Sequence, residues 1–341
     1  MAVRALIHLP GVELRSDRGE ALFSAGLTQG WERDAEVFRV RSYGQMAELI
    51  GLPSEVSVAP GVLRVAALGY EPPSDFTQFC LNFLSLEDGI VGPFDSAATD
   101  DELAEIVRLA PKLDTRALTF CKGEIDRHAL VWESRGQVVV SAVPAILGKS
   151  LSTVMPEGDG DKLLRRYIED SVDLLSELEF NRRRAEEGRP KINLFWPWGP
   201  GQRPPLPNLP LVRGEPGWVI SDSLAMQGLA RLVGYRHSVR QSLTFRRMRT
   251  EIERGIPTWV VPQTPSDPDE FAWWLRRLRD EVLQPLRELE GAVRIALTGF
   301  DGEGLALRYD SENASPGQLP FRAEILEESR ASVTDLADLR P

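Results

Sequence analysis

The residue types that most often perform chemistry are scarce in this chain. Its 341 residues include three histidines (His8, His128 and His237) and two cysteines (Cys80 and Cys121). Both cysteines lie in apolar, strand-like runs, so we interpret them as reduced thiols of the core. Two cysteines build neither a disulfide framework nor a cysteine-based zinc site by themselves. We therefore predict no metal site that depends on thiolates.

Arginines surround one of the histidines, His237. The cluster consists of Arg236, Arg240, Arg246, Arg247 and Arg249. Guanidinium groups bind phosphoesters and carboxylates through paired hydrogen bonds, so such a cluster can hold an anion. The alternative is the solvated face of a helix with interleaved acids, which Glu251 and Glu253 favour.

Five residues are our candidates for binding a small phosphorylated or otherwise anionic ligand, and none is predicted to be catalytic: His128, Arg184, Trp198, Arg203 and Arg240. His128 either faces a ligand from the end of a strand or is an internally satisfied imidazole. Trp198 and Trp196 flank a proline, so they form either an apolar wall for a ligand or the packing of a rigid loop.

Two groups of acidic residues could hold a cation. Asp267, Asp269 and Glu270 stand where a helix is expected to begin, so helix capping is the preferred interpretation. Asp301 and Glu303 alternate with glycines, which fits one weak cation site or a turn after a strand.

These residues are carried by alternating strand-like and helical runs, the pattern of an α/β fold. Helices are expected over 162–178, over 222–233 with a Ser221/Asp222 cap and a Gly234 stop, and from Asp267 onward until Pro285 kinks or ends it. The expected strands are Val3–Leu9, Glu36–Val40, Phe79–Leu84, Arg116–Cys121, Ala129–Trp132, Val138–Ala142, Asn193–Trp196, Trp218–Ile220, Thr258–Val261 and Val293–Thr298.

Two parts are predicted. Residues 1–75 and 149–341 form an α/β body with a central sheet flanked by helices, and residues 76–148 form a smaller inserted α+β domain. The adjacent Trp273 and Trp274 begin a helix in which one ring must be exposed if the other is buried. An exposed tryptophan indicates a contact surface for a second copy or another protein.

Composition excludes several partners. The net charge of −11 argues against a surface that neutralises nucleic acid phosphates. No apolar run approaches the roughly 20 residues that span a bilayer, and the first residues read as a buried strand rather than a signal peptide. A cytoplasmic protein is expected.

The segment Asn193-Leu-Phe-Trp-Pro-Trp-Gly-Pro-Gly-Gln-Arg-Pro-Pro-Leu-Pro-Asn208 resembles a signature of the archaeal-type, cofactor-independent phosphoglycerate mutases of the alkaline phosphatase superfamily. Other segments resemble that family in the same order: Ala66–Pro72, Cys80–Gly89, His128–Trp132, Asn181–Gly188 and Asp222–Gly234. The resemblance implies an alkaline-phosphatase-like sheet with an inserted substrate domain. It also implies two divalent metals, a serine nucleophile, and aspartate and histidine ligands.

The chain departs from this pattern where the chemistry should be. Counting back from Leu68-Gly69-Tyr70, the position of the serine nucleophile falls on Ala59-Pro60-Gly61, and Ser57 lies three residues away from it. The first strand ends without a carboxylate before Glu13. The two segments expected to supply histidine ligands, Pro262–Pro268 and Thr298–Glu303, contain no histidine.

Three functions remain open. The first is a degenerate, metal-independent pseudoenzyme that acts as a binding or scaffold protein. The second is an enzyme acting on a phosphoester, a mutase or a phosphatase-like protein, with a rearranged site. The third is a structural subunit whose tryptophan-rich helix docks a partner.

Overall fold

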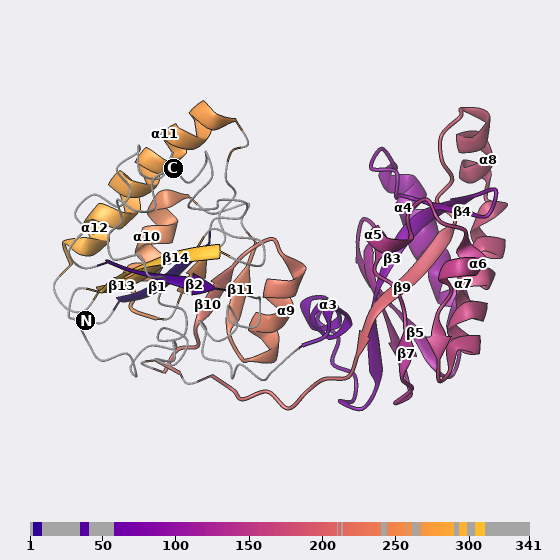
Figure 1. Cartoon of the computed structure of the whole chain (residues 1–341), viewed down its shortest axis with the longest axis horizontal. Helices are drawn as coiled ribbons and strands as arrows, with labels where there is room; N and C mark the ends of the chain where they lie inside the picture. The colour runs from indigo at the N-terminus through magenta and orange to yellow at the C-terminus, as the bar shows by residue number, and fades with distance from the viewer. Residues whose placement is uncertain are drawn as a thin grey trace. The chain divides into compact units, whose positions relative to one another are not determined.

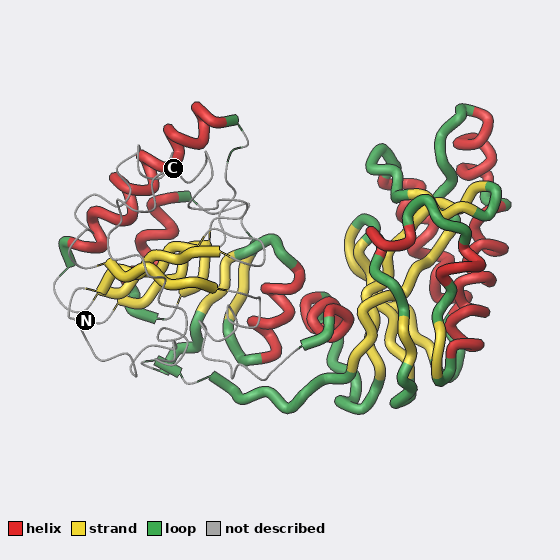
Figure 2. The backbone as a smooth tube through the Cα atoms, in the orientation of Figure 1, coloured by secondary structure: helices red, strands yellow, loops and turns green. Residues whose placement is uncertain are grey.

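The computed structural model describes residues 3–8, 35–40, 58–209, 211–212, 214–239, 244–256, 258–260, 265, 267–289, 293–298 and 304–310. The chain divides into two compact units, which are the two groups of elements in Figure 1. One unit is Met1–Ser57 with Leu206–Pro341, and the other is Val58–Pro205. Figure 2 shows that each unit mixes strands and helices, which confirms the predicted α/β class.

The first unit is built on a seven-stranded sheet. Its strands are β1 (Val3–His8), β2 (Ala35–Val40), β10 (Trp218–Ile220), β11 (Arg236–Ser238), β12 (Thr258–Val260), β13 (Val293–Thr298) and β14 (Gly304–Asp310). They lie in the order β11-β10-β12-β1-β13-β14-β2. The first five strands in this order are parallel, and β14 is antiparallel to both of its neighbours, β13 and β2. Ile7 of β1, between Val260 and Leu297, is fully buried, as expected for a central parallel strand.

The helices of this unit are α9 (Leu224–Leu232), α10 (Phe245–Glu253), α11 (Pro268–Leu278) and α12 (Gln284–Arg287). Gly234, with a φ of 78°, follows α9 as predicted. The predicted cap of α9 is corrected: Ser223 occupies the N-cap position. The Ser221 hydroxyl instead accepts a hydrogen bond from the Ser223 N–H at 3.0 Å, which closes the turn before the helix.

The helix that begins at Asp267 agrees with its predicted signals. One Asp267 carboxylate oxygen accepts hydrogen bonds from the N–H groups of Asp269 (3.0 Å) and Glu270 (2.9 Å). After α11, a π-helical turn over Arg279–Leu283 leads into α12, where Pro285 lies in the first turn. A proline has no N–H to continue an α-helical ladder, so the change of winding occurs where the sequence predicted a break.

The second unit contains an antiparallel sheet. Its strands are β3 (Thr77–Glu87), β4 (Ile90–Gly92), β5 (Leu118–Glu124), β6 (Arg127–Trp132) and β9 (Leu194–Gly201). The order is β4-β3-β6-β5, and β9 pairs with β3 as well. A short ribbon of β7 (Val138–Val139) and β8 (Glu157–Gly158) stands apart. The helices are α3 (Pro60–Ala67), α4 (Asp100–Leu109), α5 (Val143–Ile146), α6 (Leu151–Val154), α7 (Asp161–Ser176) and α8 (Glu179–Glu186).

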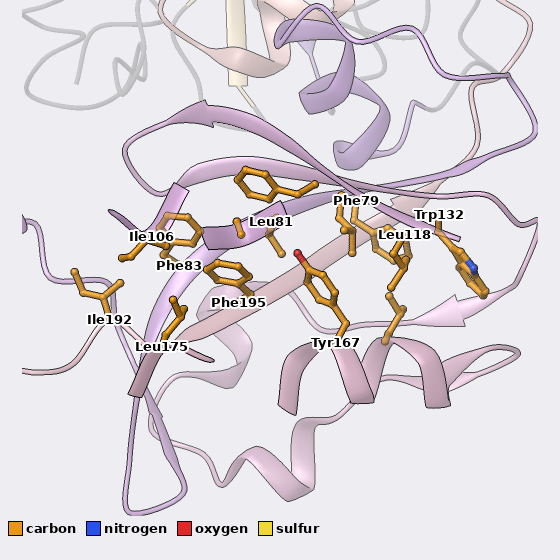
Figure 3. Close-up of a cluster of buried hydrophobic side chains, with 14 of the residues drawn as sticks. Phe79, Leu81, Phe83, Ile106, Leu118, Trp132, Tyr167, Leu175, Ile192 and Phe195 are labelled. Carbon is orange, nitrogen blue, oxygen red and sulfur yellow. The ribbon is translucent and has the colours of Figure 1, made fainter. Parts of the chain in front are cut away.

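Helices cover both faces of this sheet. Figure 3 shows Phe79 and Phe195 on the face covered by α7, where Tyr167 packs 6.3 Å from the Phe195 ring. On the opposite face, Val65 of α3 packs against Cys121 and against apolar residues of β6. The predicted inserted domain is therefore larger than 76–148: it begins before α3, and it includes β9 because that strand pairs with β3.

Within the described part of the chain, no helix combines the length and the apolar character that crossing a membrane requires.

Candidate functional site

The start of α3 is the place where the resemblance expects a serine nucleophile. Pro60 is the first residue of the helix, and Ala59 is its N-cap with extended backbone (φ −62°, ψ 146°) and no side-chain cap. Proline suits this position because its fixed φ matches the helix and its absent N–H would be unpaired there. Neither residue carries a hydroxyl. Ser57 lies outside the described residues.

The helix start rests directly on the signature strand. A Cβ added to Gly199 would lie 2.9 Å from the Cβ of Pro60, and one added to Gly201 would lie 2.2 Å from the Cβ of Ala59. The helix start also approaches β3, because a Cβ added to Gly61 would meet the Gln78 carbonyl oxygen at 2.1 Å. The glycines of the Trp-Pro-Trp-Gly-Pro-Gly segment thus allow α3 to approach the sheet at backbone contact distance.

A polar network extends from the signature tryptophan, and we call it the Asn82 network. The Trp198 indole N–H donates to the Asn82 side-chain oxygen at 2.8 Å. The Asn82 amide nitrogen donates in turn to the Asp126 carboxylate at 2.9 Å. Trp198 is half-buried, whereas Trp196 is fully buried and donates to the Ser141 carbonyl at 2.9 Å. Trp196 therefore belongs to the core, and Trp198 lies at its edge.

Arg64 lies on the same face of the sheet and is mostly withdrawn from solvent. Its guanidinium donates to the His128 carbonyl at 3.3 Å. Among the described residues, no carboxylate makes an ion pair with it. Burial lowers the pKa of Arg64, while the nearby Cys80 and Asp126 raise it and Arg127 lowers it. This guanidinium retains donors that no residue in the described ranges accepts from.

The two cysteines are buried and unpaired, as the sequence predicted for the described region. Burial raises the pKa of Cys80 to about 11, although Arg64 acts in the opposite direction. Burial also raises the pKa of Cys121 to about 12, with a smaller contribution from Asp114. Both remain protonated thiols at neutral pH, which excludes a thiolate nucleophile at these positions.

His128 has a structural role in place of the ligand contact considered from the sequence. Its ring is fully buried and stacks on Phe83, with 4.3 Å between centroids. Nδ1 accepts from the Gly123 N–H at 2.9 Å, and Nε2 is 2.8 Å from the Ile125 carbonyl, to which it donates. Burial lowers the pKa of His128 to about 4, so the ring is neutral at pH 7. Both ring nitrogens are occupied.

Arg184 also has a structural role in the interior of the second unit. It is 1% exposed and forms ion pairs with Asp95 and, at 3.0 Å, with Glu102. Its Nε donates to the Pro190 carbonyl at 2.8 Å, and Arg189 reinforces the cluster at 3.2 Å from Asp95. Because a buried charge must be compensated, this network holds α8 against α4 rather than presenting a cation to a ligand.

Two of the arginines around His237 pair with acids. Arg236 lies 3.1 Å from Glu215, and Arg249 lies 3.3 Å from Glu253. His237 is half-buried, and burial lowers its pKa. These salt bridges favour a solvated surface over an anion site. The predicted helix is corrected for Arg236 and His237, which lie on the strand β11, whereas Arg249 lies on α10.

The remaining predicted residues are separated from one another. Arg203 is exposed in the loop after β9, and Arg240 lies outside the described residues. Asp301, Glu303 and Glu13, the acids considered for a cation, lie outside them too. In the described ranges, no group of three or more histidine, cysteine or acidic side chains is arranged to hold a metal ion.

Sequence reasoning missed Arg64, Asn82 and Asp126. One signal was available for Asn82, because alternate residues of a strand share a face and Asn82 is two residues from Cys80. Arg64 follows Pro60 by four residues and therefore lies one helical turn beyond it. Its contact with the β6 carbonyl depends on tertiary packing and has no local signal.

No protein-family model matches the chain. Among curated proteins, it is 27% identical over 205 residues to the 2,3-bisphosphoglycerate-independent phosphoglycerate mutase of Methanothrix thermoacetophila, covering 54% of this chain and 52% of that protein. It is 26% identical over 176 residues to the enzyme of the same name from Methanosarcina mazei, covering 50% and 44%. The matched regions span about half the length of these relatives.

Two solved structures are similar over almost the whole chain. The cofactor-independent phosphoglycerate mutase of Thermoplasma acidophilum has a TM-score of 0.61 and 18% identity, covering 97% of this chain and 96% of that one. The PH0037 protein of Pyrococcus horikoshii has a TM-score of 0.64 and 16% identity, covering 96% and 93%. These likenesses show the fold, the alkaline-phosphatase-like fold that the sequence predicted. By sequence and by fold, the chain is similar to archaeal-type, cofactor-independent phosphoglycerate mutases.

Proposed function

We propose that the chain is a phosphoglycerate-mutase-like protein that binds a ligand or partner without catalysing phosphoryl transfer. The observation that carries this proposal is Pro60 at the first position of α3, seated against Gly199. The resemblance assigns the serine nucleophile to this place, and a pyrrolidine ring has no oxygen to attack phosphorus.

The donor set also fits two divalent cations poorly. Such a centre needs carboxylates and imidazoles held a few ångströms apart. Asp267 is engaged as the cap of α11, and the segments Pro262–Pro268 and Thr298–Glu303 contain no histidine. We derive no catalytic step through a metal for this chain.

Mutase turnover provides the test. The purified chain is incubated with 3-phosphoglycerate and Mn²⁺, Mg²⁺ or Co²⁺, and formation of 2-phosphoglycerate is followed through enolase. We expect no turnover above a heat-denatured control. Turnover that rises in proportion to protein and disappears with a chelator would overturn the proposal and favour the alternative, an enzyme with a rearranged site acting on phosphoesters.

The proposed ligand is a small anion, and Arg64 supports it. Arg64 is a largely buried guanidinium with no carboxylate partner among the described residues. A bound anion would compensate its positive charge. Asn82 adds an amide on the same side of the sheet, and the exposed Arg127, which lies 3.9 Å from the Asp126 carboxylate, adds a second cation. An oxyanion such as phosphate or a carboxylate matches these donors.

Calorimetric titration with inorganic phosphate and with 3-phosphoglycerate tests the ligand. We expect binding that Arg64→Met weakens about tenfold or more. Arg116→Met changes an exposed arginine of the same unit and should leave binding unaltered. Equal binding by all three proteins, or none by the unmodified chain, would remove Arg64 from the proposal.

We also propose a cytoplasmic location. The two buried thiols support it, since they are not paired with one another and a reducing compartment keeps such groups free.

A further inference from the structure

One tryptophan of the first unit is exposed and has an arginine over its ring. Trp273 of α11 is 54% exposed, and the Arg277 guanidinium lies 4.9 Å from its ring centroid. The same guanidinium lies 5.0 Å from the Phe245 ring and 2.5 Å from the Glu281 carboxylate. The guanidinium contacts the indole while more than half of the side chain stays exposed, the arrangement of an anchor residue at an interface.

Acidic residues precede Trp273 and arginines follow it at equal spacings. Glu270 and Arg276 lie three residues before and after it, and Asp269 and Arg277 lie four residues before and after. At 3.6 residues per turn, these positions share one face of α11 with Trp273 at its centre. The opposite face carries the buried Phe271, Leu275 and Leu278 and packs into the unit.

The two charges nearest the centre of this face have no ionic partner among the described residues. Glu270 and Arg276 are both exposed, and neither makes an ion pair in the part of the chain that the structure describes. They are six positions apart, so they cannot meet on one helix. An acid and a base placed symmetrically about one aromatic residue are complementary to the same sequence running in the opposite direction.

We propose that α11 is the contact through which two copies of this chain associate. The two helices pack antiparallel, with a two-fold axis beside Trp273, so that the two indoles meet. Glu270 of each copy then lies opposite Arg276 of the other copy. This isologous arrangement forms the same ion pair twice, as closed two-fold symmetry requires.

The contact is modest in extent, so the association is weak. A single helix pair buries less area than the roughly 1,200 Å² of a stable complex, so we expect a transient dimer with a dissociation constant on the order of 10–100 μM. Sedimentation equilibrium of the full chain from about 1 to 300 μM should therefore span the monomer–dimer transition. Raising the salt concentration should weaken the dimer, because the rim charges are screened.

The first variant removes the anchor. Trp273→Ala should weaken dimerisation about tenfold or more, because a central tryptophan is the residue type that carries most interface energy. Its side chain does not belong to the buried face, so its circular dichroism melting curve should stay close to that of the unmodified chain. Arg231→Glu, an exposed change on α9, is the matched control and should dimerise normally.

The decisive experiment exchanges the charges. In Glu270→Arg, the introduced guanidinium faces Arg276 of the other copy, and in Arg276→Glu the introduced carboxylate faces Glu270 of the other copy. Like charges repel in both cases, so each variant alone should remain monomeric. Mixed in equal amounts, the two variants should form a heterodimer, in which one cross-contact joins two native charges of opposite sign and the other joins two introduced ones. The double exchange within one chain should restore the homodimer.

A chain that stays monomeric over the whole concentration range would overturn the proposal. So would a dimer that neither Trp273→Ala nor the single charge reversals weaken, since the contact would then lie elsewhere. Two reversed variants that fail to associate when mixed would contradict the antiparallel register. None of these results depends on ligand binding or on turnover.

Discussion

Gly199 and Pro60 are in contact: a Cβ on Gly199 would lie 2.9 Å from the Cβ of Pro60, and Gly199 has a φ of 62°. The contact joins the signature strand β9 to the first residue of α3. It explains why a glycine stands between Trp198 and Pro200, because both the backbone conformation and the space exclude a side chain. It also places an apolar ring where the resemblance expects an attacking hydroxyl.

Gly199→Ala should therefore destabilise the chain by about 2–4 kcal/mol, the sum of a left-handed backbone and a steric clash. Gly188→Ala separates the two effects. Gly188 has a φ of 70° but open space around it, so only the backbone cost of about 1 kcal/mol applies. Urea unfolding of both variants measures the difference. Equal losses would show that α3 does not press on β9.

The neutral His128 makes stability depend on pH. In the unfolded chain the ring titrates near 6.5, and in the folded chain its pKa is about 4, so the unfolded chain binds more protons between these values. The contribution of His128 to the free energy of unfolding is complete above about pH 6.5. About 3 kcal/mol of it is lost as the pH falls toward 4. An NMR titration of the histidine ring protons provides the measurement, and an ordinary pKa for His128 would contradict its placement.

The Arg184 cluster should respond strongly to loss of its cation. The Ala97 N–H, together with Arg184 and Arg189, holds the pKa of Asp95 below its usual range. Arg184→Met would leave Asp95 and Glu102 facing a buried gap, at a cost of about 3–5 kcal/mol. Arg182→Met on the same helix breaks only the exposed pair with Glu177 and should cost at most about 1 kcal/mol. Denaturant midpoints of the two variants should differ accordingly; similar midpoints would count against a buried network.

Ile125 carries backbone strain in the hairpin between β5 and β6. It lies in a two-residue loop between the paired Glu124 and Arg127, with a φ of 54° that a β-branched residue rarely adopts. Ile125→Gly should stabilise the chain by about 1 kcal/mol, since relief of strain exceeds the added chain entropy. Ile125→Val retains the branch and should bring no gain. A destabilising effect of the glycine would indicate that the side chain, 60% exposed, makes a contact of its own.

Much of the fold followed from local pattern. The strand Val3–His8 and the helix after Asp267 were predictable because a continuous apolar run and a capping aspartate act within a few residues. The extent of the second unit was not predictable in this way. It depends on β9 pairing with β3, a contact between segments more than a hundred residues apart that leaves no periodic signal.

The candidate site residues also differ in whether their role could be predicted from local sequence or depends on tertiary packing. His128 and Arg184 have the right chemistry for a ligand, yet burial turns both inward, and burial depends on tertiary packing. Residue type alone therefore overestimates how many polar groups remain free. A proline where the resemblance expects a serine was, by contrast, visible in the sequence, because counting from Leu68-Gly69-Tyr70 needs no structure.

The metal content of the protein tests the central claim most directly. The chain is loaded with excess Mn²⁺ or Zn²⁺, desalted, and measured by inductively coupled plasma mass spectrometry against its own concentration. The account predicts well below one retained ion per chain. Two tightly held ions per chain would contradict it and would show that the chain builds a bimetallic centre from other donors.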